Sequence, residues 1–125
     1  FVDRKKNIVR RSGENISAAE VESILVQRTD IKGLAVAPAP DDVRGEEVMA
    51  LIVTDGPRDE VQAREITEWA LGQMAYYKAP GWVSFIDSLP LTATETGQRG
   101  EIKSLVANVL ADGKAFDLRN MKKRG

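Results

Sequence analysis

The sequence contains no cysteine and no histidine among its 125 residues. Without cysteine, the chain can form neither disulfides nor thiolate metal or redox sites. Without histidine, it has no Ser-His-Asp catalysis, no histidine metal ligands and no imidazole acid–base chemistry. No apolar run approaches the ~20 residues that a membrane-spanning helix needs. We therefore expect a cytoplasmic domain whose chemistry uses lysine, arginine, carboxylates, hydroxyls or the backbone.

Charge is also nearly balanced, since 18 basic and 19 acidic residues give a net charge of −1. This balance argues against binding of nucleic acid or other polyanions over the whole surface. Hydrophobic residues at 42% and charged residues at 30% are typical of a soluble globular protein. The length fits one compact domain over residues 1–125, and the start at Phe1 without a methionine indicates a fragment.

The apolar pattern predicts a small α+β domain. Three apolar runs, residues 34–37, 48–53 and 82–86, predict a three-stranded sheet. The first two runs are apolar at successive positions, which predicts helices over the sheet. A β-prone segment at 8–11, followed by a tight turn at 12–15, predicts an additional N-terminal β-hairpin.

Three helices are expected around this sheet. Ser17 and Glu20 have the spacing of a capping box and predict a helix that ends near Thr29. A second helix is predicted over 59–74. A third contains the periodic apolar positions between 102 and 110 and ends at Gly113. We expect a proline-rich acidic loop between the first two main strands and an irregular Thr-rich loop over 92–97.

Two segments are candidates for chemistry by their residue types alone. The turn at 12–15 contains Gly13, beside which a ligand can approach closely, and the arginines and lysines near it can bind phosphates. The Thr-rich loop offers hydroxyls and backbone amides to an anion. For both segments a plain surface turn with solvated side chains remains an open alternative.

The order of segments resembles the C-terminal domain of acyl-CoA synthetases, which belong to the adenylate-forming, AMP-binding enzyme superfamily. The resemblance is strongest to the fatty-acid and carnitine or crotonobetaine CoA ligases. Three groups of segments carry it: residues 1–8 with 12–16 and 20–22, residues 77–80 (YKAP) with 85–90 (FIDSLP), and residues 91–94 (LTAT) with 98–103 (QRGEIK).

The resemblance implies a two-step ligation that uses ATP, with magnesium, and coenzyme A. A carboxylic acid reacts with ATP to give an acyl-adenylate, and the CoA thiol then displaces AMP. It also implies a partner, the enzyme's own N-terminal adenylating domain, which holds ATP and the acyl group. The chain itself is then the mobile lid, and we expect no activity from it alone.

The resemblance further assigns roles to single residues. Arg4 matches the arginine near the adenylate ribose, and Lys6 matches the hinge between the two domains. Gly13 matches the glycine of the pantetheine tunnel, and Glu14 and Asn15 follow it as cofactor-binding residues.

The third signature departs from the family at its catalytic lysine. Thr96 occupies that position in an ungapped alignment, or Gln98 if Gly97 is taken as the preceding glycine. Neither residue supplies a cation, and loss of such a donor costs on the order of 10²–10³ in rate. Lys103 lies further along the chain.

Two alternatives remain open at this point. One is an adenylation domain that loads a carrier protein instead of CoA. The other is a non-catalytic interaction or nucleic-acid-binding domain that uses the basic ends of the chain, although the sequence has no aromatic platform among those basic residues.

Overall fold

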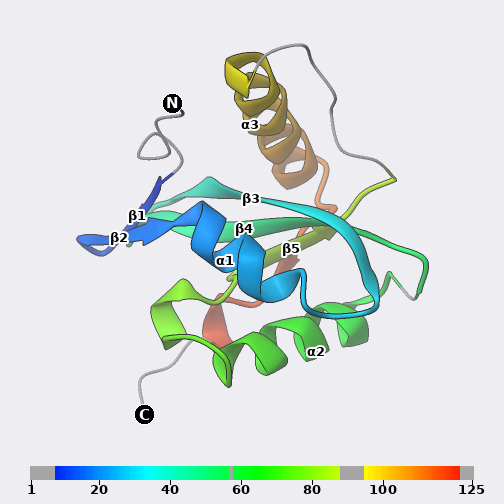
Figure 1. Cartoon of the computed structure of the whole chain (residues 1–125). Coiled ribbons are helices and arrows are strands. Elements are labelled where there is room, and N and C mark those ends of the chain that lie inside the picture. Colours follow the sequence, from blue (N-terminus) through cyan, green and yellow to red (C-terminus); the bar gives the residue numbers. More distant parts are fainter. Residues whose placement is uncertain (1–7, 57, 88–94, 122–125) are drawn as a thin grey trace.

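The computed structural model describes residues 8–56, 58–87 and 95–121, with the backbone alone for 95–99. Figure 1 shows the arrangement of its helices and strands. In chain order they are β1 (Ile8–Arg11), β2 (Glu14–Ser17), α1 (Ala18–Leu25), β3 (Ile31–Asp41), β4 (Gly45–Thr54), α2 (Glu60–Leu71), the 3₁₀ turn η2 (Tyr76–Lys78), β5 (Trp82–Phe85), α3 (Glu95–Ala111), β6 (Phe116–Asp117) and the 3₁₀ turn η3 (Arg119–Met121).

The strands form one mixed sheet, which confirms the α+β class and the N-terminal hairpin. The order is β2-β1-β4-β5-β6, and β3 pairs with β4. Pairs are antiparallel except β4 with β5. The predicted count of three main strands is too low, because the described sheet has six strands. The hairpin joins it through the pair Arg11↔Gly45, and β6 has only two residues, too few for a periodic signal.

The prediction of a long proline-rich loop is wrong, since residues 38–41 of that segment belong to β3 and residues 45–47 to β4, which leaves only residues 42–44 as the turn. Pro38 pairs with Val48 and Pro40 with Glu46, so the two strands run together to the pair Asp41↔Gly45. Among the described strands β3 pairs only with β4 and is therefore an edge. Proline is tolerated at an edge because the sheet does not need its missing N–H there.

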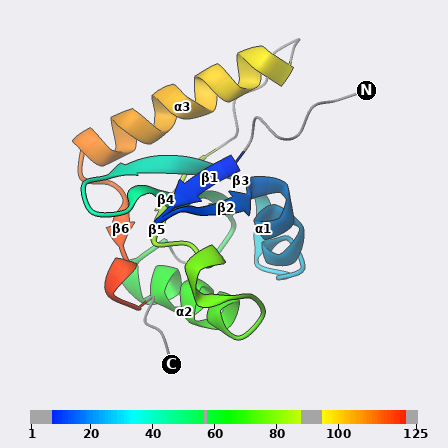
Figure 2. The same cartoon turned by 90° about the vertical axis from the view of Figure 1, so that its left-hand side faces the viewer.

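Apolar side chains lie on both faces of the sheet, as the sequence predicted. Ala50 and Ile52 belong to the cluster that includes residues of α1 and α2. Met49 and Leu51 belong to a second cluster, which includes residues of α3. Figure 2 shows α3 on one side of the sheet and α2 on the other. Strand β4 thus separates two hydrophobic layers. Within the described residues, no helix is long and apolar enough to span a membrane.

The sequence predicted the three helices correctly but located their ends less accurately. The Ser17 hydroxyl accepts a hydrogen bond from the Glu20 amide at 3.3 Å and confirms the cap of α1. This helix ends at Leu25, before Thr29, because the amides of Gln27 and Arg28 bond to carbonyls three residues back instead of four.

The other two helices also differ from the predicted bounds at one end. α2 ends at Leu71, three residues before the predicted Met74. Gly113 has a φ of +69° just after α3, which confirms its predicted role at the end of that helix. The prediction of an irregular loop is wrong for residues 95–97, which form the start of α3. A helix that has formed extends by further residues at little cost in free energy. Positions 92–94 lie outside the described residues.

Candidate functional site

The turn at Ser12 and Gly13 is the sequence-predicted feature that the structure defines best. Arg11 pairs with Glu14, so two residues connect β1 and β2. Their φ angles are +52° and +84°, as in the type I′ turns of tight hairpins. A Cβ on Gly13 would meet no atom within 4 Å. Glycine is therefore required here by the backbone, and the space beside it is open to a ligand.

The other predicted site residues are distributed unevenly. Glu14 and Asn15 are exposed in the strand that leaves the turn, so three predicted cofactor-binding residues lie together at the tip of the hairpin. Arg4 and Lys6 lie outside the described residues. Thr96 belongs to the first turn of α3, where only the backbone is described, and Lys103 is exposed two turns later.

The hairpin tip is attached to the turn between β3 and β4. The Ser12 amide donates to the Arg44 carbonyl at 2.9 Å, and Arg44 Nη1 donates to the Ser12 hydroxyl at 3.3 Å. Two residues before Ser12, the Arg10 amide donates to Glu46 Oε1 at 2.8 Å. These bonds join two turns that are far apart in the sequence.

A buried ion pair lies beneath these surface contacts. Arg11 Nε donates to Glu47 Oε1 at 2.9 Å, and the two side chains are 3% and 1% exposed. The sequence did not indicate this pair, because Glu46 and Glu47 belong to an acidic segment before an apolar strand and resemble solvated acids. One signal was available. A strand covered on both faces leaves few exposed positions, so a charge within it needs a partner.

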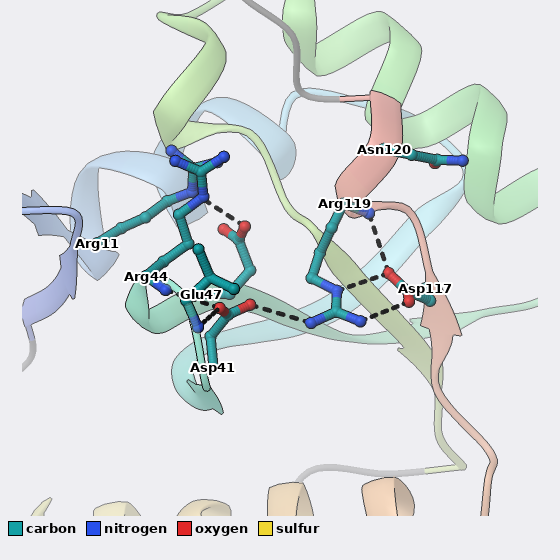
Figure 3. A pocket seen from close by; sticks show the side chains of 8 residues that line it. Arg11, Asp41, Arg44, Glu47, Asp117, Arg119 and Asn120 are labelled. Atoms are coloured by element: carbon teal, nitrogen blue, oxygen red, sulfur yellow. Dashed lines mark hydrogen bonds and ion pairs between the residues drawn. The ribbon is translucent and has the colours of Figure 1, made fainter.

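A cavity of about 400 Å³ opens next to the ion pair, between the hairpin tip and the C-terminal strand (Figure 3). Three arginines and three carboxylates are among its lining residues. The lining comprises Arg11, Asp41, Val43, Arg44, Glu47, Asp117, Arg119 and Asn120. The sequence indicated the arginines near Gly13 and the basic C-terminal end as possible anion-binding groups, but it did not indicate that these residues share a cavity, because β1, β3, β4 and the C-terminal segment meet only in the folded chain.

Arg119 connects the two acidic sides of this cavity. Its guanidinium donates to Asp117 at 2.7 and 2.8 Å and to Asp41 at 3.0 Å, as Figure 3 shows, and it lies 4.6 Å from the centre of the Trp82 ring. The hydrogen bond from Arg119 is the main cause that lowers the pKa of Asp117. Burial raises the pKa of Asp41, but the Arg44 amide and Arg119 together outweigh it and leave this pKa lowered.

The arrangement is suited to binding and positioning more than to acid–base chemistry. Arg119 and Arg11 both have carboxylate partners, and Arg44 is exposed beside the open space at Gly13. Across the part of the chain that the structure describes, no group of three or more acidic residues could hold a metal ion. The hairpin tip thus offers a narrow backbone and an open approach, with the exposed Arg44 beside it.

Comparisons with known proteins identify the family of the chain. Residues 20–96 match the family of AMP-binding enzyme C-terminal domains. The chain is 36% identical over 104 residues to the indoleacetate–CoA ligase of Aromatoleum aromaticum. This alignment covers 83% of the chain and 20% of that enzyme. It is also 36% identical over 91 residues to the crotonobetaine/carnitine–CoA ligase of Proteus mirabilis. That alignment covers 72% of the chain and 17% of the enzyme.

A solved structure shows the same fold at similar identity. The anthranilate CoA ligase AuaEII, solved in complex with anthranoyl-AMP, matches with a TM-score of 0.73 and 32% identity, over 85% of this chain and 21% of that one. The chain therefore spans about a fifth of the length of these proteins.

Proposed function

This chain belongs to the family of AMP-binding enzyme C-terminal domains, and from that premise we propose that it is the mobile C-terminal domain of an ATP-dependent acyl-CoA ligase. The longer protein converts a carboxylic acid and ATP to an acyl-adenylate and pyrophosphate, and then transfers the acyl group to the thiol of CoA, which releases AMP. The observation that carries this proposal is the family match together with similarity to CoA ligases.

In this proposal the hairpin tip serves the second reaction step. The open space at Gly13 allows the thin pantetheine arm to pass close to the backbone, with Glu14 and Asn15 beside it. Arg4 contacts the adenylate ribose. ATP, magnesium and the carboxylic acid are held by the N-terminal adenylating domain of the same cytoplasmic enzyme. The resemblance to fatty-acid and carnitine or crotonobetaine CoA ligases favours a role in fatty acid metabolism.

The test is to assay the full-length protein for the two reaction steps separately. We expect carboxylate-dependent exchange of pyrophosphate into ATP, and CoA-dependent release of the thioester. The 125-residue chain alone should catalyse neither. Thioester formation on a phosphopantetheinyl carrier protein but not on CoA would contradict the proposal, and so would salt-sensitive binding of nucleic acid without either reaction.

Lys6 is proposed as the hinge, because it matches the hinge position of the family, and a hinge residue must change its φ and ψ without disturbing a packed element. Lys6→Pro fixes φ at this position and should leave pyrophosphate exchange intact while it lowers thioester formation. Lys6→Ala removes the charge but keeps the backbone free, and serves as the matched control. Equal loss of both reactions in Lys6→Pro would exclude the hinge.

Thr96 is proposed to occupy the position of the adenylating lysine. A lysine there would place a cation near the substrate carboxylate and the α-phosphate, so Thr96→Lys should raise the rate of pyrophosphate exchange, by up to about 10²-fold. Gln98→Lys tests the alternative alignment. An unchanged exchange rate in Thr96→Lys would remove this residue from the mechanism.

A further inference from the structure

The carboxylate of Glu47 has a fixed orientation inside the protein. Its Oε1 accepts a hydrogen bond from Arg11 Nε at 2.9 Å, and its Oε2 accepts one from the Val48 amide at 2.8 Å. The Glu47 side chain is 1% exposed. Both oxygens are therefore engaged in a place where water does not compete for them.

Gly81 lies directly against this carboxylate. A Cβ at Gly81 would lie 2.6 Å from Cδ and 2.9 Å from Oε1 of Glu47. Gly81 is held by the backbone on both sides, because its amide donates to the Val48 carbonyl at 2.9 Å and its carbonyl accepts from the Leu118 amide at 2.8 Å. A side chain at Gly81 would therefore displace the head of Glu47 rather than the strand.

Arg11 connects Glu47 to the Ser12–Gly13 turn. It is the residue before Ser12, its side chain is 3% exposed, and its guanidinium carbon lies 5.9 Å from the centre of the Tyr76 ring. Its main chain pairs with Gly45. The Glu47 carboxylate and the Tyr76 ring restrict this guanidinium on the sides away from the cavity, so we expect a displacement of Glu47 to move the backbone at the entry to the turn.

We propose that Glu47, seated on Gly81, is a positioning residue for the Ser12–Gly13 turn: it holds Arg11 and thereby sets where CoA passes the hairpin tip. This inference rests on the proposed function, because it takes CoA as the ligand at Gly13. Glu47 acts through Arg11 and touches no substrate. Displacing it should weaken the use of CoA and leave formation of the acyl-adenylate unchanged.

The decisive variant is Gly81→Ala in the full-length protein. Its methyl group pushes the Glu47 carboxylate away from Arg11, and we expect the KM for CoA to rise about ten-fold, because a small misplacement of a positioning group is costly. Pyrophosphate exchange should stay within about two-fold of the wild-type rate. Gly72→Ala is the matched control, since a Cβ there makes only an ordinary contact at 3.5 Å.

A double-mutant cycle identifies Glu47 as the residue through which Gly81 acts. In a Glu47→Ser background the colliding carboxylate is gone, so Gly81→Ala should add less than about two-fold to the KM for CoA. Hydrogen exchange of residues 8–17 gives a second readout that does not need activity. Gly81→Ala should speed exchange at the Ser12 amide, which donates to Arg44, while exchange in α2 stays unchanged.

Three results would overturn the inference. The first is a Gly81→Ala variant in which both the KM for CoA and the hydrogen exchange at the Ser12 amide are unchanged. The second is an equal loss of pyrophosphate exchange and thioester formation in that variant. The third is a rise in the KM for CoA that Gly81→Ala causes to the same extent in the Glu47→Ser background. Failure of the proposed function looks different, because the wild-type protein would then form no CoA thioester at all. In that case exchange at the Ser12 amide still decides whether Glu47 positions the turn.

Discussion

The two ends of the β3–β4 hairpin both contain an arginine–carboxylate pair, but they use it differently. At the end where β3 begins, Arg28 binds Asp30 through two hydrogen bonds of 2.9 and 2.7 Å, and Gln62 of α2 donates to the same carboxylate at 2.6 Å. The Asp30 side chain is 30% exposed. At the other end, Arg11 and Glu47 are almost completely buried.

The first pair joins elements, since Asp30 lies between α1 and β3 and reaches α2. The second pair lies beneath a turn with positive φ at Ser12 and Gly13, beside a third such residue, Gly45. A buried ion pair adds little net stability compared with an apolar replacement, but breaking it is costly. We infer that Arg11 and Glu47 fix a position in the backbone, whereas Arg28 and Asp30 connect the elements around them.

The largest effect is expected from removing one carboxylate at each end. Glu47→Ala should lower the free energy of unfolding by about 3–5 kcal/mol, because it leaves a buried guanidinium without its partner. Asp30→Ala should cost only about 1–2 kcal/mol, because Arg28 is 12% exposed and still has the Glu65 carboxylate at 3.9 Å. Urea unfolding of both variants gives the comparison, and equal losses would remove the distinction between the two ends.

The next effect separates backbone strain from function. Gly13 and Gly113 have φ of +84° and +69°, and a Cβ at either would meet no atom within 4 Å. Each Gly→Ala change should therefore cost about 1–2 kcal/mol of stability, through the left-handed backbone alone. In the full-length protein only Gly13→Ala should also raise the KM for CoA. A similar rise in Gly113→Ala would show that the effect is general destabilisation.

The smallest effect is the response to acid. The hydrogen bond from Arg28 is the main cause that lowers the pKa of Asp30 below 3.8, and Arg119 lowers that of Asp117. A carboxyl with a lowered pKa stabilises the fold above its unfolded pKa, and this stability is lost as the pH falls through its folded pKa. Stability should therefore decrease below about pH 4.

Asp30→Asn tests this contribution at the far end of the sheet, with Asp117→Asn as its counterpart beside the cavity. The stability difference between wild type and each variant should shrink as the pH falls from about 6 to about 2.5. Urea unfolding midpoints measured across this range give the answer. A difference that stays constant would mean that the titration of these two groups does not contribute.

Local signals in the sequence predicted local structure well. The turn at Ser12 and Gly13 and the cap at Ser17 were predicted because each depends on residues close together in the chain. The extent of β3 was missed because proline is a weak guide at an edge strand, where pairing with β4 overrides it. β6 was missed because two residues show no period.

Some residues of the candidate site could likewise be identified from the sequence, and others could not. Gly13 was identifiable because a positive φ and a close approach both require glycine at one position. The partnership of Arg11, Glu47 and Gly81 was not, since the three residues come from three separate strands or loops, and an arginine or glutamate has no local sign of burial. Their meeting depends on the register of β1 against β4 and of β4 against β5.

Composition and short-range patterns in the sequence were enough to exclude cysteine and histidine chemistry and to predict the α+β class, the family resemblance and the glycine turn. Which charges are buried, which carboxylate binds Arg11 and where the cavity opens became known from the folded chain. The physical reason is that burial and ion pairing depend on distances between residues far apart in the chain, and those distances exist only once the strands have paired.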